Sequence, residues 1–201
     1  MKYHVIITGD VVQSRSHEAV EWLPSLEDGI KKYAVSYDIF RGDSFQAEIT
    51  VENCFQSIFY LKAVMRQFEG MDIRIGIGVG DIDFKDKSIK KSSGTAFILS
   101  GQALDSLTKE TLEFKSPWPD LDERINLILT LSSRLSDQWT SNMAETVKTA
   151  MDNPGANQTE LTQIIGRKYQ SQVSTELGKA NYSKINQSIH YCTKELKQYV
   201  N

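Results

Sequence analysis

A double-proline segment divides this chain into two kinds of sequence. At Ser116-Pro117-Trp118-Pro119-Asp120, each proline disfavours helix in the residue before it, so a helix is not expected to cross this point. Before this segment strand-like and helix-like patterns alternate, and after it every apolar pattern has the helical period. We therefore predict two domains in 201 residues, an α/β domain over residues 1–115 and an all-helical domain over residues 116–201.

The first part predicts the element order β-α-β-β-α-β-α, a ferredoxin-like arrangement. Within residues 71–80, isoleucine and valine alternate with glycine, the period of a strand that lets another group approach its backbone closely. A hairpin turn is expected at Arg41-Gly42-Asp43. The elements are strands over 3–8, 37–40, 44–50 and 71–80, and helices over 17–35, 53–68 and 95–114.

The second part predicts only helices. They cover 121–135 and about 137–151, followed by two short helices and a last one that ends near Tyr199. We also expect Trp118 to pack across the boundary between the two parts.

Cys54 and Cys192 lie on apolar helical faces without metal-ligand spacing, so buried thiols are expected rather than a disulfide or a metal site.

The net charge of −3 argues against a protein that coats nucleic acid uniformly. Residues 1–150 contain 22 acidic and 17 basic side chains, whereas residues 151–201 contain four acidic and six basic ones. No apolar run approaches the roughly 20 residues that span a bilayer, and the first residues do not have the pattern of a secretion signal. We therefore expect a cytoplasmic protein without a membrane partner.

Residues 158–180 have the pattern of a helix-turn-helix. Thr159 is the expected N-cap of a short helix, whose inner face carries Leu161, Ile164 and Ile165, and Gly166 ends it. The next helix is expected to begin about Gln170, with Val173 and Leu177 facing inward at i and i+4.

This pattern resembles the helix-turn-helix of bacterial regulators, which implies DNA as a partner and a second helix in the major groove. Neutral side chains at its start match the donors and acceptors of base edges, and nearby cations match phosphates. A homodimer is expected if binding is specific. The alternatives are a helical hairpin with a solvated outer face and a module that binds protein. The candidate DNA contacts are Arg167, Lys168, Gln170, Ser171, Gln172, Ser174, Thr175 and Lys179.

Two aspartates are placed where a metal ion could be held. Asp10 follows the first strand and Asp43 lies in the hairpin turn, and the two segments are neighbours in a sheet of this order. Paired carboxylates suit Mg²⁺, which usually shares its ligands with phosphates. The alternative is that Gly9-Asp10 and Gly42-Asp43 are simply turns.

Four motifs in order resemble the core of class III nucleotide cyclases: ITGDVV at 7–12, RGDSFQAEI at 41–49, IRIGIGVGDID at 73–83 and SGTAFILSGQALD at 93–105. The resemblance implies a cyclase-like sheet, metal binding by Asp10 and Asp43, and a nucleotide ligand. It departs from the family where an asparagine and an arginine stabilise the transition state, because Ile98 and Gln102 stand there, and Ser93 stands where an acidic base-selecting residue is usual. We assign no catalytic residue.

Five features follow one another along nearly the full length of the chain: GDVVQSR, GDSFQ, GIGVGDI, the Pro-Trp-Pro segment and the helix-turn-helix pattern. In this combination the chain resembles the SatD family of bacterial proteins. The expected function is a DNA-binding transcriptional regulator whose cyclase-like domain senses a ligand or mediates dimerisation. The alternative is a metal-dependent enzyme that binds or converts a nucleotide with Asp10 and Asp43.

Overall fold

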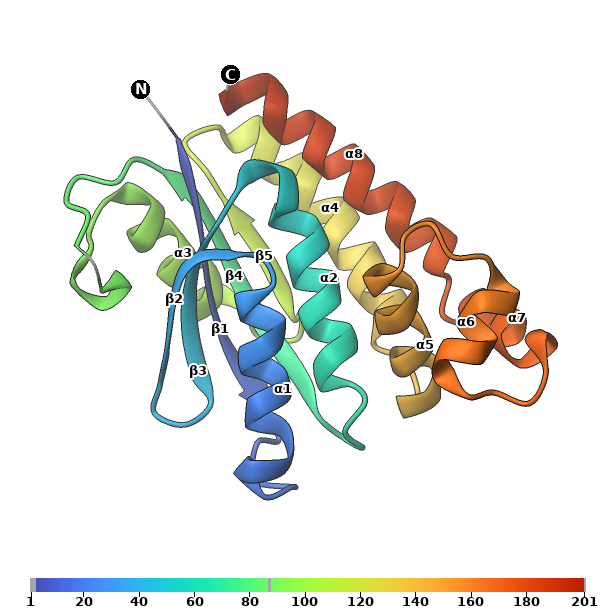
Figure 1. The fold of residues 1–201 in the computed structure, drawn as a ribbon. Coiled ribbons are helices and arrows are strands. Elements are labelled where there is room, and N and C mark those ends of the chain that lie inside the picture. Colours follow the sequence, from blue (N-terminus) through green and yellow to red (C-terminus); the bar gives the residue numbers. More distant parts are fainter. Residues whose placement is uncertain (1–2, 87, 201) are drawn as a thin grey trace.

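The computed structural model describes residues 3–86 and 88–200, which form five strands and eight α-helices (Figure 1). The strands are β1 (His4–Val12), β2 (Ala34–Phe40), β3 (Ser44–Ile49), β4 (Asp72–Gly80) and β5 (Leu112–Lys115). The helices are α1 (Ala19–Lys31), α2 (Cys54–Met65), α3 (Thr95–Ser106), α4 (Pro119–Ser136), α5 (Ser141–Asp152), α6 (Gln158–Ile165), α7 (Gln170–Lys179) and α8 (Tyr182–Val200). Two 3-10 turns, η1 (Val51–Asn53) and η2 (Ile89–Lys91), precede α2 and α3. The chain is thus a mixed α/β protein with an all-helical C-terminal region, as predicted.

The five strands form one sheet in the order β2-β3-β1-β4-β5. Neighbouring strands are antiparallel except β4 and β5, which are parallel. The prediction of one helix over 95–114 was wrong, because α3 ends at Ser106 and the chain then forms β5. Leu112 and Phe114 point inward there, 1% and 0% exposed. Four residues are too few for a period of two to be recognised beside a strong helical pattern.

Side chains of α4 close the outer edge of β5. The amide of Asn126 accepts a hydrogen bond from the backbone N–H of Phe114 at 2.8 Å and donates one to the Phe114 carbonyl at 2.9 Å. Asp122 accepts a bond from the backbone N–H of Ser116 at 3.1 Å and one from its hydroxyl at 2.6 Å. The side chains therefore replace part of the ladder that a further strand would make.

The alternating glycines of β4 lie against α3. Helices α1 and α2 cover one face of the sheet and α3 covers the other (Figure 1). A Cβ atom added at Gly76 or Gly78 would overlap backbone atoms of α3, including the carbonyl oxygens of Ser100 and Ala96. The close approach predicted from the sequence is thus made by a helix of the same chain.

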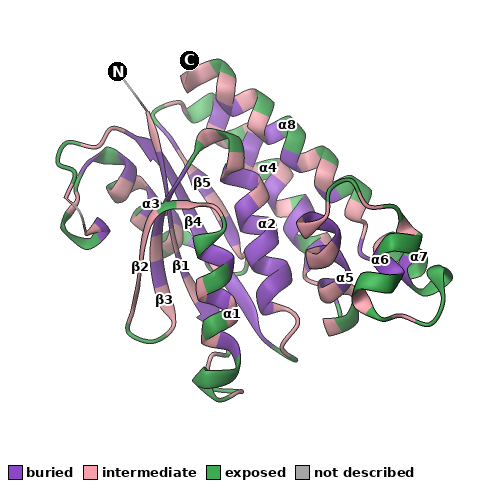
Figure 2. Cartoon of the chain, in the orientation of Figure 1, coloured by how far each residue is buried: buried purple, intermediate pink, exposed green. Residues whose placement is uncertain are grey.

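One apolar core continues across the double-proline segment. It includes Val5 and Ile77 of the sheet, Leu121 of α4 and Ile189 of α8, and α2 is buried along nearly its whole length between sheet and helices (Figure 2). The ring of Trp118 lies 4.7 Å from that of Tyr3 and 5.2 Å from that of Tyr199. Trp118 therefore packs between the two parts, as expected, while the domain division itself stays a prediction.

A buried cluster of charges joins α2 to the segment between α4 and α5. The Lys62 ammonium is fully buried and donates to both carboxylate oxygens of Asp72, at 2.9 and 3.0 Å, and to the Thr111 hydroxyl at 3.0 Å. It also lies 2.9 Å from an oxygen of Asp137. Arg66 donates to Asp72 at 2.7 Å and to the Asp137 carbonyl at 2.5 Å. Each buried charge thus has an opposite partner.

Candidate functional site

The two helices predicted as a helix-turn-helix are present as α6 and α7. The N-cap of α6 is Asn157, not Thr159: its side chain accepts bonds from the N–H groups of Thr159 and Glu160, and the Glu160 carboxylate accepts one from the Asn157 N–H. The sequence contains the signal for this capping box, because Asn157 precedes Glu160 by three positions. Gly166 ends α6 in the left-handed conformation, at φ 78°.

A small apolar cluster fixes α7 on α5 and α6. Val173 of α7, Leu161 of α6 and Ala150 of α5 are its buried members, and Leu177 packs against them. The inward direction of Val173 and Leu177 is therefore confirmed. The prediction for Ile164 was wrong, because its side chain is 56% exposed. In so short a helix, positions 161 and 165 share the inner face, and position 164 lies outside it.

The outer face of α7 is exposed and carries the predicted neutral side chains. Gln170, Ser171, Gln172, Ser174 and Thr175 are all exposed. Two have local partners, since Gln170 donates to Gln158 and Gln172 accepts a bond from the backbone N–H that precedes α7 at 3.0 Å. A groove of about 450 Å³ runs between this face and the start of α5. Ser171, Ser174 and Thr175 have no hydrogen-bond partner for their hydroxyls within residues 3–86 and 88–200.

The three predicted phosphate contacts differ in their surroundings. Lys168 and Lys179 are exposed, and within the described part of the chain neither forms an ion pair. Arg167 is only 17% exposed. Its guanidinium donates to Glu145 at 2.8 Å and to both carboxylate oxygens of Glu176 at 3.2 Å. Arg167 therefore holds the turn onto α5 and α7, while the two lysines face solvent.

Asp10 and Asp43 lie at one end of the sheet, as expected from the strand order. Ser44 pairs with Asp10 in the ladder, and the Val11 N–H donates to the Asp43 carbonyl at 3.0 Å. They line a hollow of about 340 Å³ together with Arg74. Arg74 donates to the two Asp10 oxygens at 2.9 and 2.6 Å, and this bond raises the pKa of Arg74.

Arg74 decides how well the two aspartates suit Mg²⁺. Its guanidinium already supplies a positive charge to both oxygens of Asp10, so a metal ion would have to displace it. Within residues 3–86 and 88–200, no group of three or more His, Cys, Asp or Glu side chains is placed to hold a metal. The residues present therefore do not fit a cyclase-type metal site in this arrangement.

Two of the positions that depart from the cyclase pattern lie on the outer side of α3, and the third, Ser93, lies in the loop before it. Ile98 and Gln102 are both exposed. Ser93 pairs with Phe84 in an isolated bridge between the two sides of the loop before α3. None of the three lines the hollow of Asp10 and Asp43.

A buried carboxylate, Glu48, was not recognised in the sequence. Its side chain lies at the other end of β3 and accepts hydrogen bonds from His4 at 2.9 Å, Lys85 at 3.0 Å and Ser36 at 3.4 Å. Burial raises the pKa of Glu48, but the bonds from Lys85 and His4 together lower it further, so that the net pKa lies below its usual value. Glu48 therefore ties the loop before α3 to the sheet as a charged group.

Both cysteines are buried free thiols, as expected. Burial raises the pKa of Cys192 to about 12 and that of Cys54 still further. Neither thiol is therefore a reactive nucleophile at neutral pH.

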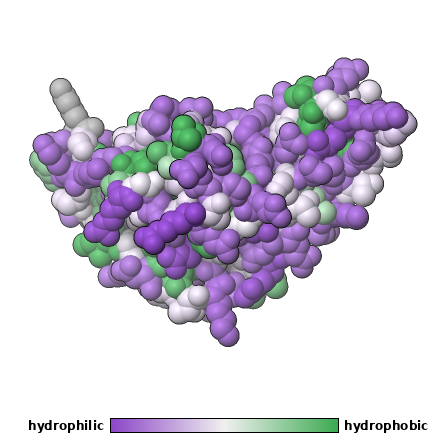
Figure 3. Space-filling model, turned by 90° about the horizontal axis from the view of Figure 1, so that it is seen from below, coloured by the Kyte–Doolittle hydropathy of each residue, from purple (hydrophilic) through white to green (hydrophobic). Residues whose placement is uncertain are grey.

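The surface seen from below is mostly hydrophilic, and the hydrophobic residues on it form small separate groups (Figure 3). None of the helices in the described ranges has the length and apolar character needed to traverse a bilayer. Comparison with known proteins gave no match, neither to a protein-family model nor to a curated protein.

Proposed function

We propose that the chain is a DNA-binding transcriptional regulator. The observation that carries the proposal is the outer face of α7, where exposed Gln and Ser side chains stand at the start of a helix fixed by its own small core. Such side chains both donate and accept hydrogen bonds, as base edges in the major groove require. Lys168 and Lys179 lie at the two ends of this face and supply cations for phosphates.

The proposed mode of binding places α7 in the major groove as the second helix of a helix-turn-helix. Gln170 can face adenine with both its donor and its acceptor, while Ser171 and Ser174 reach single base-edge groups. Few phosphates are contacted by one copy, so the monomer binds loosely and in a salt-sensitive way. Specific binding therefore calls for two copies on a two-fold symmetric site, and the cyclase-like sheet supplies ligand sensing or dimer contacts.

Fluorescence anisotropy with labelled duplex DNA at low salt tests this proposal. Gln170→Ala/Ser174→Ala removes two outer side chains of α7, and Gln163→Ala removes an exposed glutamine of α6 as the matched control. We expect the double variant to weaken binding at least about tenfold and the control to leave it unchanged. Equal affinities for the two variants would remove the major-groove assignment, and no binding by the wild type would remove the function.

The second candidate is a metal-dependent nucleotide enzyme. The adjacency of Asp10 and Asp43 favours it, while the occupation of Asp10 by Arg74 stands against it. We derive no catalytic step from this arrangement. Incubation with ATP or GTP and Mn²⁺ tests the candidate: turnover that disappears in Asp43→Ala would establish it, and turnover that survives would exclude these aspartates.

A further inference from the structure

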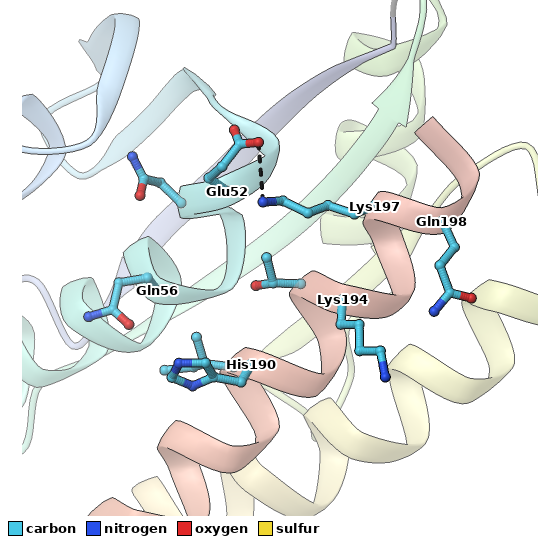
Figure 4. A pocket seen from close by; sticks show the side chains of 9 residues that line it. Glu52, Gln56, His190, Lys194, Lys197 and Gln198 are labelled. Atoms are coloured by element: carbon cyan, nitrogen blue, oxygen red, sulfur yellow. Dashed lines mark ion pairs between the residues drawn. The ribbon is translucent and has the colours of Figure 1, made fainter. Parts of the chain in front are cut away.

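A hollow lies between α8 and the segment where η1 passes into α2 (Figure 4). Its volume is about 680 Å³, within the range of pockets that hold small molecules. Neither the sequence motifs nor the proposed DNA surface includes it. We call it the α2–α8 groove.

One side of α8 presents basic side chains to this groove. His190, Lys194 and Lys197 follow each other at intervals of four and three residues, which places them on one helical face. Lys197 reaches across the groove and pairs with Glu52 of η1 at 3.4 Å (Figure 4). Lys194 is exposed and forms no ion pair with any residue in the ranges 3–86 and 88–200.

The lining also contains polar groups whose hydrogen-bonding capacity is unused. The Thr193 hydroxyl oxygen is buried and has no partner among the described residues. Such an atom is costly to leave unsatisfied, and rotation of this side chain about χ1 exchanges its hydroxyl and methyl positions. On the opposite wall the side chain of Asn53 precedes α2 without capping it.

Charge and donors together define what the groove can hold. Glu52 is the one acidic residue in its lining, and Lys197 neutralises it. The remaining groups are an ammonium, an imidazole, a hydroxyl and side-chain amides, with Ile189 as an apolar floor. This set has an excess of hydrogen-bond donors and of positive charge, so it complements an anion with several acceptor atoms. A bound cation would find no unpaired carboxylate in this lining.

We propose that the α2–α8 groove binds a small organic anion through a carboxylate or phosphate group. Lys194 and the Thr193 hydroxyl hold the anionic group, and Ile189 contacts the apolar part of the ligand. Bound there, the anion bridges η1 and α2 to α8, segments more than 130 residues apart in the chain. The proposal is independent of DNA binding.

Titration of the ¹⁵N-labelled full chain by NMR tests it, with inorganic phosphate and succinate as probes and sodium chloride at matched ionic strength as reference. We expect saturable shifts at the groove residues and at the His190 ring. Lys194→Gln should raise Kd about tenfold and Thr193→Val about fivefold. Lys184→Gln, which removes an exposed lysine of α8 outside the groove, should leave Kd unchanged.

Thermal melting of the free protein gives a second readout. Thr193→Val should raise Tm, because it removes a buried hydroxyl without a partner, while it weakens anion binding. The stronger of the two probes identifies the anionic group. Shifts that do not saturate, or equal Kd changes in Lys194→Gln and Lys184→Gln, would overturn the proposal, as would a Thr193→Val variant that binds the probes like the wild type.

Discussion

Arg167→Ala separates two roles that the same arginine could have in a helix-turn-helix. The sequence places Arg167 among the phosphate contacts, whereas the structure places its guanidinium between Glu145 and Glu176. A phosphate contact would contribute to DNA binding and little to folding. An internal ion pair would contribute to folding, and its loss would leave the salt dependence of binding intact.

The expected loss of stability follows from the exposure of the partners. The Glu176 side chain is 16% exposed, and after the change its one remaining partner among residues 3–86 and 88–200 is the Thr146 hydroxyl. The hydrogen bonds that it loses are charge-assisted and partly buried. The Glu145 side chain is 42% exposed, so its pair with Arg167 is screened by water and adds little. We therefore expect Arg167→Ala to lower the free energy of unfolding by about 2–3 kcal/mol.

Urea unfolding measures the stability, and anisotropy over a series of salt concentrations measures the slope of log K against log salt. Lys168→Ala is the matched control, because Lys168 is an exposed neighbour without an ion pair in the described ranges. We expect it to change stability by less than about 0.5 kcal/mol and to reduce the slope by about 0.9 for each phosphate that the variant no longer neutralises.

If Arg167→Ala reduced the salt slope as Lys168→Ala does and left the free energy of unfolding unchanged, Arg167 would be a phosphate contact. The ion pairs with Glu145 and Glu176 would then have no role in holding the turn.

Three further outcomes can be measured by unfolding. Gly178→Ala should raise the free energy of unfolding by about 0.5–1 kcal/mol, because a methyl group there meets no atom within 4 Å. Gly78→Ala should lower the free energy of unfolding by about 1–3 kcal/mol, because its methyl group would overlap α3. Equal effects of the two variants would contradict this packing. Lys62→Met should lower it by about 3–5 kcal/mol, and adding Asp72→Asn should recover part of the loss; no recovery would argue against the buried pair. The net pKa of Glu48 is lowered, because burial, which raises it, is outweighed by bonds from a lysine and a histidine. The charged Glu48 therefore stabilises the folded state above the unfolded-state pKa of 4.5, and this stabilisation is lost as pH falls through the folded-state pKa. The difference in Tm between wild type and Glu48→Gln should shrink below about pH 4.5. A difference in Tm that stays constant with pH would refute this reasoning.

The parts of the fold that could be predicted are those with a long, regular period. The strand of alternating isoleucine and glycine and the helix α4 were predicted nearly to their ends because each carries several repeats of one pattern. Strand β5 was missed because its pairing with β4 is decided by a neighbour more than 30 residues away, and only Leu112 and Phe114 reveal its period.

In the candidate site, too, features with a regular local pattern could be predicted and contacts between distant residues could not. The outer residues of α7 could be named because the helical period separates them from Val173. The partners of Arg167 and Asp10 could not, since Glu145 lies 22 residues from Arg167 and Arg74 lies 64 residues from Asp10. Such contacts are set by the tertiary arrangement, and a local pattern contains no information about them.

The amide of Asn126 has a consequence for how copies of this chain can associate. Because Asn126 and Asp122 satisfy outward backbone groups at β5, that side of the sheet offers a poor template for an incoming strand. Continuous sheets between molecules, including the stacked strands of aggregates, would have to begin at β2 on the opposite side. Asn126 and Asp122 of one helix together thus hinder the addition of another strand at this edge of the sheet.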